Sequence, residues 1–242
     1  MKKHHLLLPD RKLLKKTGEL DYFHWSYKFP LKYLMKYRYN TILDLLGDKK
    51  YNSILEAGTG SGIFLPELSK HCNQLYACDI HNHFDHVPDL CKKYNINNLN
   101  VSSQSIDSTN YPDKSFDAVV ALSLLEFVPD IPKAVAEIKR ILKEDGIFIT
   151  ILPMESNLLD FFLSFYLRKS PKEEFSDSRQ KVSSVLEQNF TVIEKGYFTP
   201  FLGKSFPVYT HYKLEKHSAY RSPTTVKFTK KASHPKTEKM QA

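Results

Sequence analysis

A run of glycines that begins at Gly58 is the part of the sequence best suited to chemistry. Gly58, Gly60 and Gly62 alternate with small polar residues, directly after the apolar stretch 53–57 and before a segment with helical periodicity. Glycine has no Cβ, so the backbone can turn tightly and approach a ligand, while free N–H groups at the start of a helix can face it. The spacing predicts a ligand-binding turn between a strand and a helix.

The same run fits a dinucleotide poorly. Dinucleotide-binding folds use a G-x-G-x-x-G/A turn, whose last small residue lets the helix pack closely on the strand. Here that position is Ile63, and the third glycine comes one residue early. The alternatives are a different nucleoside ligand or a tight turn that binds nothing.

Alternating strand and helix patterns surround the glycines and would position them. Expected strands cover 53–57, 74–78, 100–102, 116–121 and 147–152, and expected helices cover 63–70, 89–94 and 131–142. Such alternation predicts a doubly wound, mostly parallel α/β sheet with helices on both faces. After Pro153, a helix at 177–188 and two strands at 191–197 and 207–214 predict an antiparallel hairpin at the end of the sheet.

Two further segments are expected to form a cap over the sheet. Residues 20–50 are rich in aromatic residues and predict one or two helices, and residues 157–168 predict a helix that is apolar nearly all round. The expected organisation is a basic segment 1–17, one domain 18–215 with cap elements 18–48 and 153–175, and a basic, disordered tail 216–242.

The charge of +8 lies at the two ends of the chain of 242 residues. Residues 1–16 contain six Lys or Arg and one acid, residues 216–242 contain seven and one, and the rest therefore carries −3. This argues against a basic groove for nucleic acid and favours solvated, loosely ordered ends, with an anionic membrane surface as the alternative partner. Three cysteines without CxxC spacing, and no apolar run of about 20 residues, favour a reducing, cytoplasmic location.

The glycine run Glu56-Ala57-Gly58-Thr59-Gly60-Ser61-Gly62 and four further motifs in order give the sequence a family resemblance. The four are Asp79 at the end of the second expected strand and the segments 104–117, 119–130 and 137–147. Together they resemble the class I S-adenosylmethionine-dependent methyltransferases of the small-molecule type. The resemblance covers roughly residues 50–153 and implies a Rossmann-like, seven-stranded sheet whose last strand is antiparallel, with an N-terminal helical cap and an inserted helix after the fifth strand.

The resemblance also implies the cofactor and its site. S-adenosyl-L-methionine would bind, S-adenosyl-L-homocysteine would leave, and Asp79 would accept both ribose hydroxyls. The sequence departs from the family at Ser105, where Asp is common, and at Phe127, where many relatives have His. The expected cofactor-binding residues are Glu56, Gly58, Thr59, Gly60, Gly62, Asp79, Ile80, Ser105, Ile106, Asp107 and Leu122.

Methyl transfer from a sulfonium is an in-line displacement that mainly requires alignment and exclusion of water. A base is needed only where the acceptor must lose a proton, and His24, Tyr22 and Tyr27 are the candidates. No metal is expected: His81, His83 and His86 match no closed zinc pattern and lie in the loop after Asp79.

The sequence therefore predicts a cytoplasmic methyltransferase that acts on a small, apolar or lipid-like acceptor. The basic ends and the apolar helix 157–168 suggest peripheral contact with an anionic membrane. The alternatives are an RNA or protein methyltransferase, and a catalytically weak partner subunit with this fold. The oligomeric state is not predicted.

Overall fold

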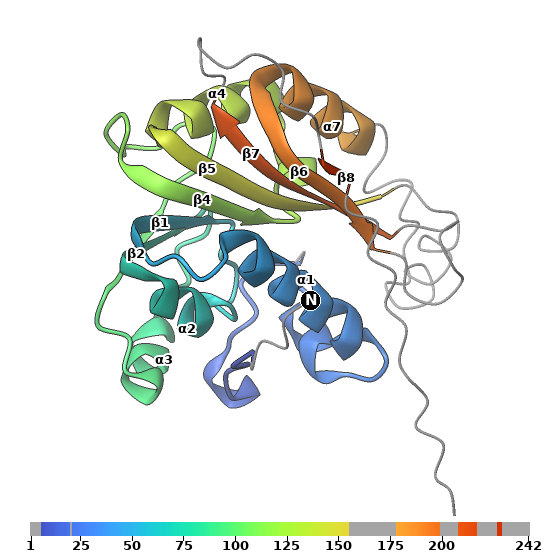
Figure 1. The fold of residues 1–242 in the computed structure, drawn as a ribbon. Helices are drawn as coiled ribbons and strands as arrows, with labels where there is room; N and C mark the ends of the chain where they lie inside the picture. Colours follow the sequence, from blue (N-terminus) through green and yellow to red (C-terminus); the bar gives the residue numbers. More distant parts are fainter. Residues whose placement is uncertain (1–5, 20, 155–177, 199–207, 217–226, 229–242) are drawn as a thin grey trace, which may run out of the picture.

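The computed structural model describes residues 6–19, 21–154, 178–198, 208–216 and 227–228, and one sheet runs through its centre (Figure 1). The strands lie in the order β3-β2-β1-β4-β5-β7-β6-β8. They are β1 (Tyr51–Ala57), β2 (Cys72–Asp79), β3 (Leu99–Ser103), β4 (Phe116–Leu122), β5 (Leu142–Pro153), β6 (Phe190–Phe198), β7 (Tyr209–Lys216) and β8 (Lys227–Phe228). The helices are α1 (Leu31–Leu46), α2 (Leu65–Leu68), α3 (Val87–Tyr94), α4 (Ile131–Ile141) and α7 (Ser178–Asn189).

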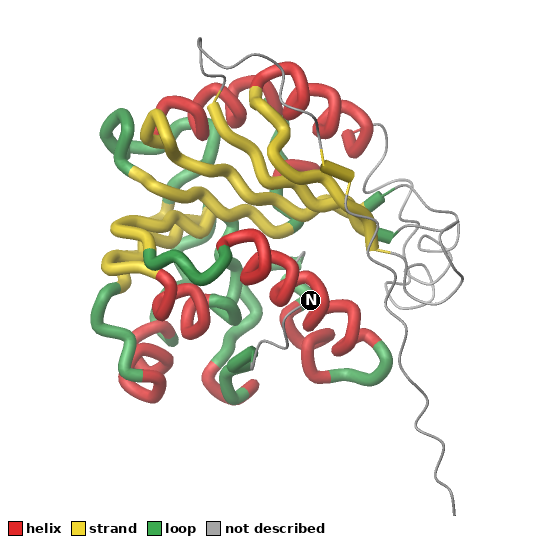
Figure 2. The backbone as a smooth tube through the Cα atoms, in the orientation of Figure 1, coloured by secondary structure: helices red, strands yellow, loops and turns green. Residues whose placement is uncertain are grey.

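Helices cover both faces of the sheet, as the sequence predicts. Figures 1 and 2 show α1, α2 and α3 below the sheet and α4 and α7 above it. Successive strand residues point to opposite faces, so Ile54 belongs to the lower hydrophobic core and Leu55 to the upper one. Both faces of the central strands are therefore buried from solvent, which agrees with their continuous apolar sequences.

The order of the strands creates a switch point at β1 and β4. β1 pairs in parallel with β2 on one side and with β4 on the other, and β4 pairs in parallel with β5. The connections that leave β1 and β4 thus diverge, which opens a crevice beyond their carboxyl ends. The glycine turn follows β1 at this crevice.

The far half of the sheet contains the predicted antiparallel strand. β7 lies between β5 and β6 and is antiparallel to both. The structure adds an eighth strand, because Lys227 and Phe228 pair in parallel with β6, where the sequence predicts seven strands and a tail without structure. β5 begins at Leu142 rather than 147, because Leu142 pairs with Phe116 across an irregularity in the register.

The N-terminal segment packs on the domain, so its interpretation as a loose chain end is wrong for residues 6–17. Leu14 is buried in the lower core, the Leu7 N–H donates to Glu67 Oε2 (3.0 Å), and the Asp10 N–H donates to the Tyr94 hydroxyl (2.7 Å). The predicted helix 157–168 lies outside the described residues. None of the described helices is long and apolar enough to cross a membrane.

The upper core yields a stability prediction. Phe148 of β5 is fully buried and its ring lies 5.8 Å from that of Phe190. Phe148→Ala should lower the free energy of unfolding by about 3–5 kcal/mol, since it leaves a cavity that the sheet cannot close. Tyr33→Ala, at a residue that is 57% exposed, is the control and should change it by less than about 0.5 kcal/mol in urea unfolding. Equal losses for the two variants would contradict this account of the core.

Candidate functional site

The glycine turn takes a backbone path that only glycine adopts at low cost. Gly58, Gly60 and Gly62 have φ angles of 72°, 52° and 74°. A Cβ on Gly58 would lie 2.8 Å from Leu124 Cδ1, so its absence lets the loop after β4 close onto the loop after β1. The alternating glycines of the sequence are thus explained by backbone conformation and by close packing.

Asp79 ties this turn to the end of β2. Its Oδ2 accepts from the Gly60 N–H (2.9 Å) and its Oδ1 accepts from the Ile80 N–H (2.8 Å). The Gly58 N–H also donates to the Cys78 carbonyl (2.9 Å). Each carboxylate oxygen retains a free lone pair, so the fixed carboxylate can still accept from ligand hydroxyls.

Glu56 lies at the base of the turn and is almost completely buried. Burial raises the pKa of its carboxyl to about 8, and the nearby Asp79 carboxylate acts in the same direction. The Thr59 hydroxyl donates to Glu56 Oε2 (2.9 Å) and partly offsets the effect of burial. With a pKa of about 8, the Glu56 carboxyl is mostly protonated at neutral pH, and a cation bound beside it would favour its charged form.

A cavity of about 910 Å³ opens at the carboxyl ends of β1, β2, β4 and β5. Of the expected cofactor-binding residues, those that line it are Glu56, Gly58, Thr59, Gly60, Asp79, Ile80, Ser105 and Leu122. Ile80 is notable because its side chain is 78% exposed next to Asp79. An exposed apolar side chain beside a fixed carboxylate offers a flat contact for one face of a base.

Three of the expected residues do not line the cavity. Gly62 lies under the turn, where a Cβ would be 2.8 Å from Leu65 Cδ1. Ile106 is buried in the upper core. Asp107 makes hydrogen bonds with Ser105 and Ser108, which lower its pKa, and faces Lys133 at 3.8 Å. Cofactor binding by their side chains stays a prediction.

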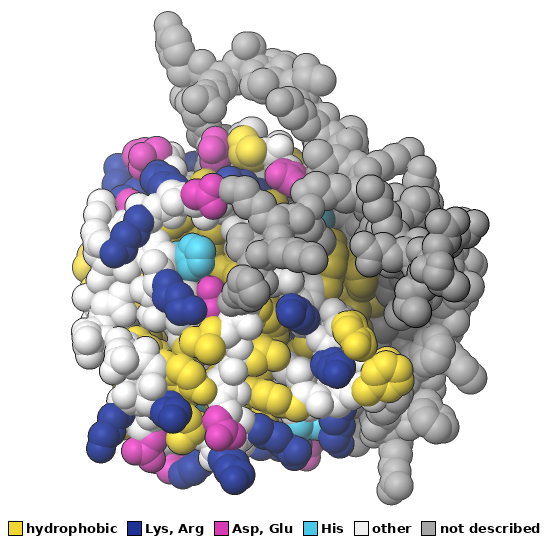
Figure 3. Space-filling view, turned by 60° about the horizontal axis from the view of Figure 1, so that its bottom comes forward, with side chains coloured by type: hydrophobic (Ala, Val, Ile, Leu, Met, Phe, Trp, Pro, Cys, Tyr) yellow, Lys and Arg dark blue, Asp and Glu magenta, His cyan; other side chains and the backbone are white. Residues whose placement is uncertain are grey.

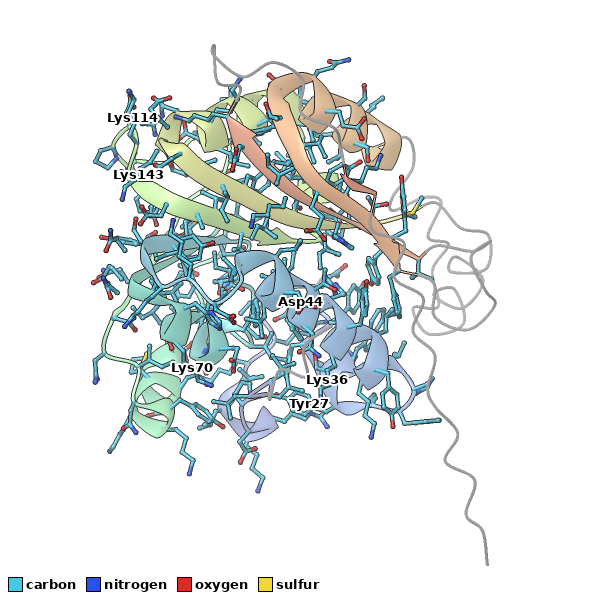
Figure 4. All side chains as sticks on the ribbon, viewed as in Figure 1. Tyr27, Lys36, Asp44, Lys70, Lys114 and Lys143 are labelled. Atoms are coloured by element: carbon cyan, nitrogen blue, oxygen red, sulfur yellow. The ribbon has the colours of Figure 1, made fainter. Side chains whose placement is uncertain are left out.

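Of the three candidate bases, one lines the cavity and two do not. Tyr22 lines the cavity and stacks on Trp25, with ring centroids 4.5 Å apart. The Tyr27 hydroxyl donates to the Pro9 carbonyl (2.5 Å), burial raises its pKa, and the residue lies below the sheet on the side of Lys36 (Figure 4). His24 is not among the lining residues, and partial burial together with Lys28 lowers its pKa. Tyr22 is the candidate that the structure brings to the cavity.

The histidines after Asp79 contact the turn itself. The His81 Nε2 donates to the Gly60 carbonyl (3.2 Å) and the His86 Nε2 to the Ser61 carbonyl (2.9 Å). His83 stacks on His81, with ring centroids 5.9 Å apart. Among the residues that the structure describes, no group of three His, Cys, Asp or Glu side chains is arranged to hold a metal ion.

Sequence reasoning missed several residues of the cavity, and the most informative are Asp21, Arg38 and Tyr209. Asp21 accepts from the Thr17 N–H and lies over the turn, 3.6 Å from the position of a Cβ on Gly60. Arg38 gives a signal in the sequence, because it falls on the same face of α1 as the buried Met35 and Ile42. Tyr209 gives none, because its contact arises from the insertion of β7.

The charges around the cavity restrict its ligand. Its lining includes the acids Glu19, Asp21, Glu56, Asp79 and Glu126, and the strong bases among the described lining residues are limited to Arg38. A polyphosphate would meet several carboxylates at close range, whereas a nucleoside that carries a cationic group would be complementary to them. The fixed Asp79, the exposed Ile80 and this excess of acids fit S-adenosylmethionine, which combines a ribose, a base and a sulfonium.

The surface around the site bears on the predicted membrane contact. In the view of Figure 3, hydrophobic side chains lie among Lys and Arg side chains. Phe29 and Tyr33 are exposed to 76% and 57%, and their rings meet edge to face at 6.1 Å. The apolar segment 157–168 lies outside the described residues, so a membrane partner stays a prediction. Lys114 and Lys143 lie far from Tyr27 and Lys36, on the opposite side of the molecule (Figure 4).

The fold is Rossmann-like, with a cavity at its switch point whose lining suits a nucleoside, and comparisons with known proteins show what the chain is similar to. Residues 55–150 match the family model of a methyltransferase domain. The uncharacterized methyltransferase YcgJ of Bacillus subtilis is 25% identical over 114 residues, which are 46% of this chain and 45% of YcgJ. The mitochondrial arginine-hydroxylase NDUFAF5 of Rattus norvegicus is 24% identical over 171 residues, 68% of this chain and 47% of NDUFAF5.

Solved structures show the same fold. The crystal structure of YcgJ has a TM-score of 0.59 at 16% identity and covers 76% of this chain and 100% of YcgJ. That of NodS from Bradyrhizobium japonicum, an N-methyltransferase in complex with S-adenosyl-L-homocysteine, has a TM-score of 0.58 at 16% identity and covers 76% and 87%. Residues 55–150 thus match a methyltransferase domain, and the described residues share their fold with solved S-adenosylmethionine-dependent methyltransferases. The chain spans a little under half the length of YcgJ and of NDUFAF5. One of these relatives is named a methyltransferase and the other an arginine-hydroxylase.

The buried Glu56 yields a prediction on pH and stability. Its pKa is about 8 in the folded protein and near 4.5 when exposed, so between these values the folded state binds more protons than the unfolded state. Its contribution to stability is thus complete below about pH 4.5 and declines up to pH 8. Glu56→Gln stays neutral, and its free energy of unfolding should rise relative to that of the native protein as the pH increases through this window.

Urea unfolding of the native protein and of Glu56→Gln at pH steps from 5 to 8 measures this difference. Asp145→Asn, at an exposed carboxyl far from the cavity, controls for the removal of one acid. A difference between Glu56→Gln and the native protein that is constant with pH would contradict the raised pKa.

Proposed function

We propose that this chain transfers a methyl group from S-adenosyl-L-methionine to a small, apolar or lipid-like acceptor. The observation that carries the proposal is the cavity at the switch point, where a fixed carboxylate and an exposed apolar side chain lie beside an excess of acids. The family match over residues 55–150 supports the same reaction.

The chain's own residues would bind and orient the reactants. When bound, the cofactor supplies a methyl group already activated on a positively charged sulfur. Asp79 would accept the ribose hydroxyls, and Ile80 and Ser105 would border the base. Glu56, which is bonded to Thr59, and Asp21, which lies next to Gly60, would stabilise positive charge in the cavity, since opposite charges attract strongly where water is scarce.

Apolar side chains of the cavity outside the glycine turn support the choice of acceptor. They come from segments that lie far apart in the sequence, with Arg38 and Glu126 also in the lining, and they are Trp25, Met35, Phe127, Val128, Pro129, Pro153 and Tyr209. Such walls exclude water and hold an apolar body in line with the donor. Tyr22, stacked on Trp25, is the group placed to orient an acceptor hydroxyl or amine or to take its proton.

Two alternatives make different demands on the molecule. An RNA or protein methyltransferase would hold its polymer through the basic ends, whereas a partner subunit would bind the nucleoside weakly or only in a complex. Binding of a nucleoside by the isolated chain disfavours the partner subunit. Turnover of a small acceptor that does not change when residues 229–242, which follow β8, are removed disfavours the polymer.

Asp79 yields the central test. S-adenosyl-L-homocysteine should bind the purified chain at micromolar concentration, and Asp79→Ala should weaken this binding by about 10–100-fold, because hydrogen bonds to a charged group are worth about 1.5–3 kcal/mol. Calorimetric titration measures both affinities. Asp145→Asn should bind as the native chain does, since this exposed acid lies outside the cavity.

Failure of the native chain to bind at millimolar ligand would overturn the proposal for an autonomous enzyme. Equal affinities of Asp79→Ala and the native chain would instead place the nucleoside elsewhere. Because Asp79 also accepts the Gly60 N–H, Asp79→Asn is the milder variant, which keeps one side-chain oxygen to bond with the turn.

A further inference from the structure

Two aromatic side chains lie exposed where the chain enters α1. Phe29 and Tyr33 are four residues apart, and their rings meet edge to face with centroids 6.1 Å apart. Among the large apolar side chains that the structure describes, only Ile80 is as exposed as Phe29, and Ile80 lines the cavity. Removal of apolar surface from water is favourable, so a partner that covers the two rings would be stabilised by them.

Three lysines surround these rings. Lys28, Lys32 and Lys36 are exposed and recur every four residues, which places them on one side of the first turns of α1. The Lys32 N–H donates to the Lys28 carbonyl (2.7 Å), and the Lys32 Nζ lies 5.2 Å from the centre of the Tyr33 ring. No carboxylate of the described residues forms an ion pair with any of the three lysines. Together with Phe29 and Tyr33 they form what we call the aromatic–lysine surface.

The N-terminal segment adds positive charge to the same side of the molecule. Partial burial lowers the pKa of His24, and the nearby charges of Lys28, Arg11 and Lys16 lower it further, whereas the Asp21 carboxylate raises it. Bases from two segments of the chain thus gather around one ring. Figure 3 turns this lower side of the molecule forward and shows Lys and Arg side chains around hydrophobic ones.

The aromatic–lysine surface borders the cavity. Lys36 directly follows Met35, a residue of the cavity lining, on α1. The tight 3₁₀ turn Phe23–Tyr27, which contributes Phe23 and Trp25 to the lining, leads directly into Lys28. The same short stretch of chain therefore supplies an apolar wall inside the cavity and a basic, aromatic surface outside it.

An anionic lipid membrane suits this combination of side chains. Lysines attract negatively charged headgroups, and their apolar stems lie along the boundary while the ammonium groups stay in water. Aromatic rings are favoured at the level between headgroups and acyl chains. A single-stranded nucleic acid is usually bound along a basic groove with its bases stacked on aromatic faces, whereas the rings of Phe29 and Tyr33 meet edge to face.

We propose that the aromatic–lysine surface binds this chain to an anionic lipid membrane, with Phe29 and Tyr33 entering the headgroup region. The surface is argued from its own side chains and charges, and only its role rests on the proposed function. That role is to bring the cavity to an apolar acceptor dissolved in the bilayer. The contact is made by residues 28–36 and does not require the tail or the segment 157–168.

The first test is co-sedimentation of the full chain with vesicles of phosphatidylcholine, alone and mixed equally with phosphatidylserine. The native chain should bind the mixed vesicles at least about tenfold more tightly at low salt. Lys32→Gln/Lys36→Gln should weaken this binding by about tenfold or more, since each base near an anionic surface contributes about fivefold.

The matched control is Lys133→Gln/Lys181→Gln. It removes the same charge at exposed residues of α4 and α7, which lie on the opposite face of the sheet from α1 (Figure 1). This control should bind the mixed vesicles as the native chain does, within about threefold. Equal losses for the two double variants would overturn the proposal, because binding would then follow net charge alone.

Phe29→Ala/Tyr33→Ala tests the entry of the rings. This variant should bind the mixed vesicles about tenfold more weakly and keep its preference for anionic lipid, because apolar burial is lost and charge is not. Both side chains are exposed, so urea unfolding should match that of the native chain. Unchanged vesicle binding by a folded variant would overturn the entry of the rings.

The remaining outcomes also decide. Failure of the native chain to bind the mixed vesicles overturns the proposal. So does loss of binding on removal of residues 229–242 when Lys32→Gln/Lys36→Gln binds normally, since the tail then makes the contact. Binding of oligouridylate that Lys32→Gln/Lys36→Gln weakens, without binding of vesicles, would assign the surface to nucleic acid instead. A chain that binds vesicles and fails to bind S-adenosyl-L-homocysteine would refute the proposed function and uphold the surface.

Discussion

The bonds between the loop after β1 and the end of β2 determine the form of the whole site. The Gly58 N–H is bonded to the Cys78 carbonyl and the Gly60 N–H to the Asp79 carboxylate, so the turn cannot move independently of β2. Because Asp79 closes the turn with one part of its carboxylate and faces the cavity with another, the shape of the site and its ligand chemistry depend on one side chain. This turn requires three residues at positive φ, a backbone conformation that glycine adopts with little strain.

The parts of this arrangement that depend on local sequence could be predicted. The alternation of apolar segments predicts the central strands and helices, and the spacing of Gly58, Gly60, Gly62 and Asp79 predicts the turn and the acid beside it. Helix α2 is shorter than the expected helix 63–70, since the chain continues from Leu68 into a tight 3₁₀ turn. The residues at which a helix begins and ends depend on its packing, and the hydrophobic periodicity of the sequence does not reveal them.

The parts that depend on long-range topology could not be predicted. The hairpin of β6 and β7 is visible in the sequence, but its insertion with β7 beside β5 is what brings Tyr209 to the cavity, next to Pro153. Likewise, Asp21 reaches the glycine turn only because the N-terminal segment packs against α2 and α3, with Leu7 bonded to Glu67 and Asp10 to Tyr94. Arg38 is intermediate: a charged residue on the apolar face of α1 indicates a special role without showing which.

The distribution of charge explains how a cavity with a strong binding motif can have so few candidate bases. Among the described lining residues, acids gather at the glycine turn, and one guanidinium, that of Arg38, also faces the cavity. The Tyr27 hydroxyl is bonded to a backbone carbonyl away from the cavity, and the surroundings of His24 favour its neutral form. A donor that is already activated needs alignment more than proton transfer. In keeping with this need, hydrogen bonds hold two charged groups of the cavity in place, Asp79 and Arg38.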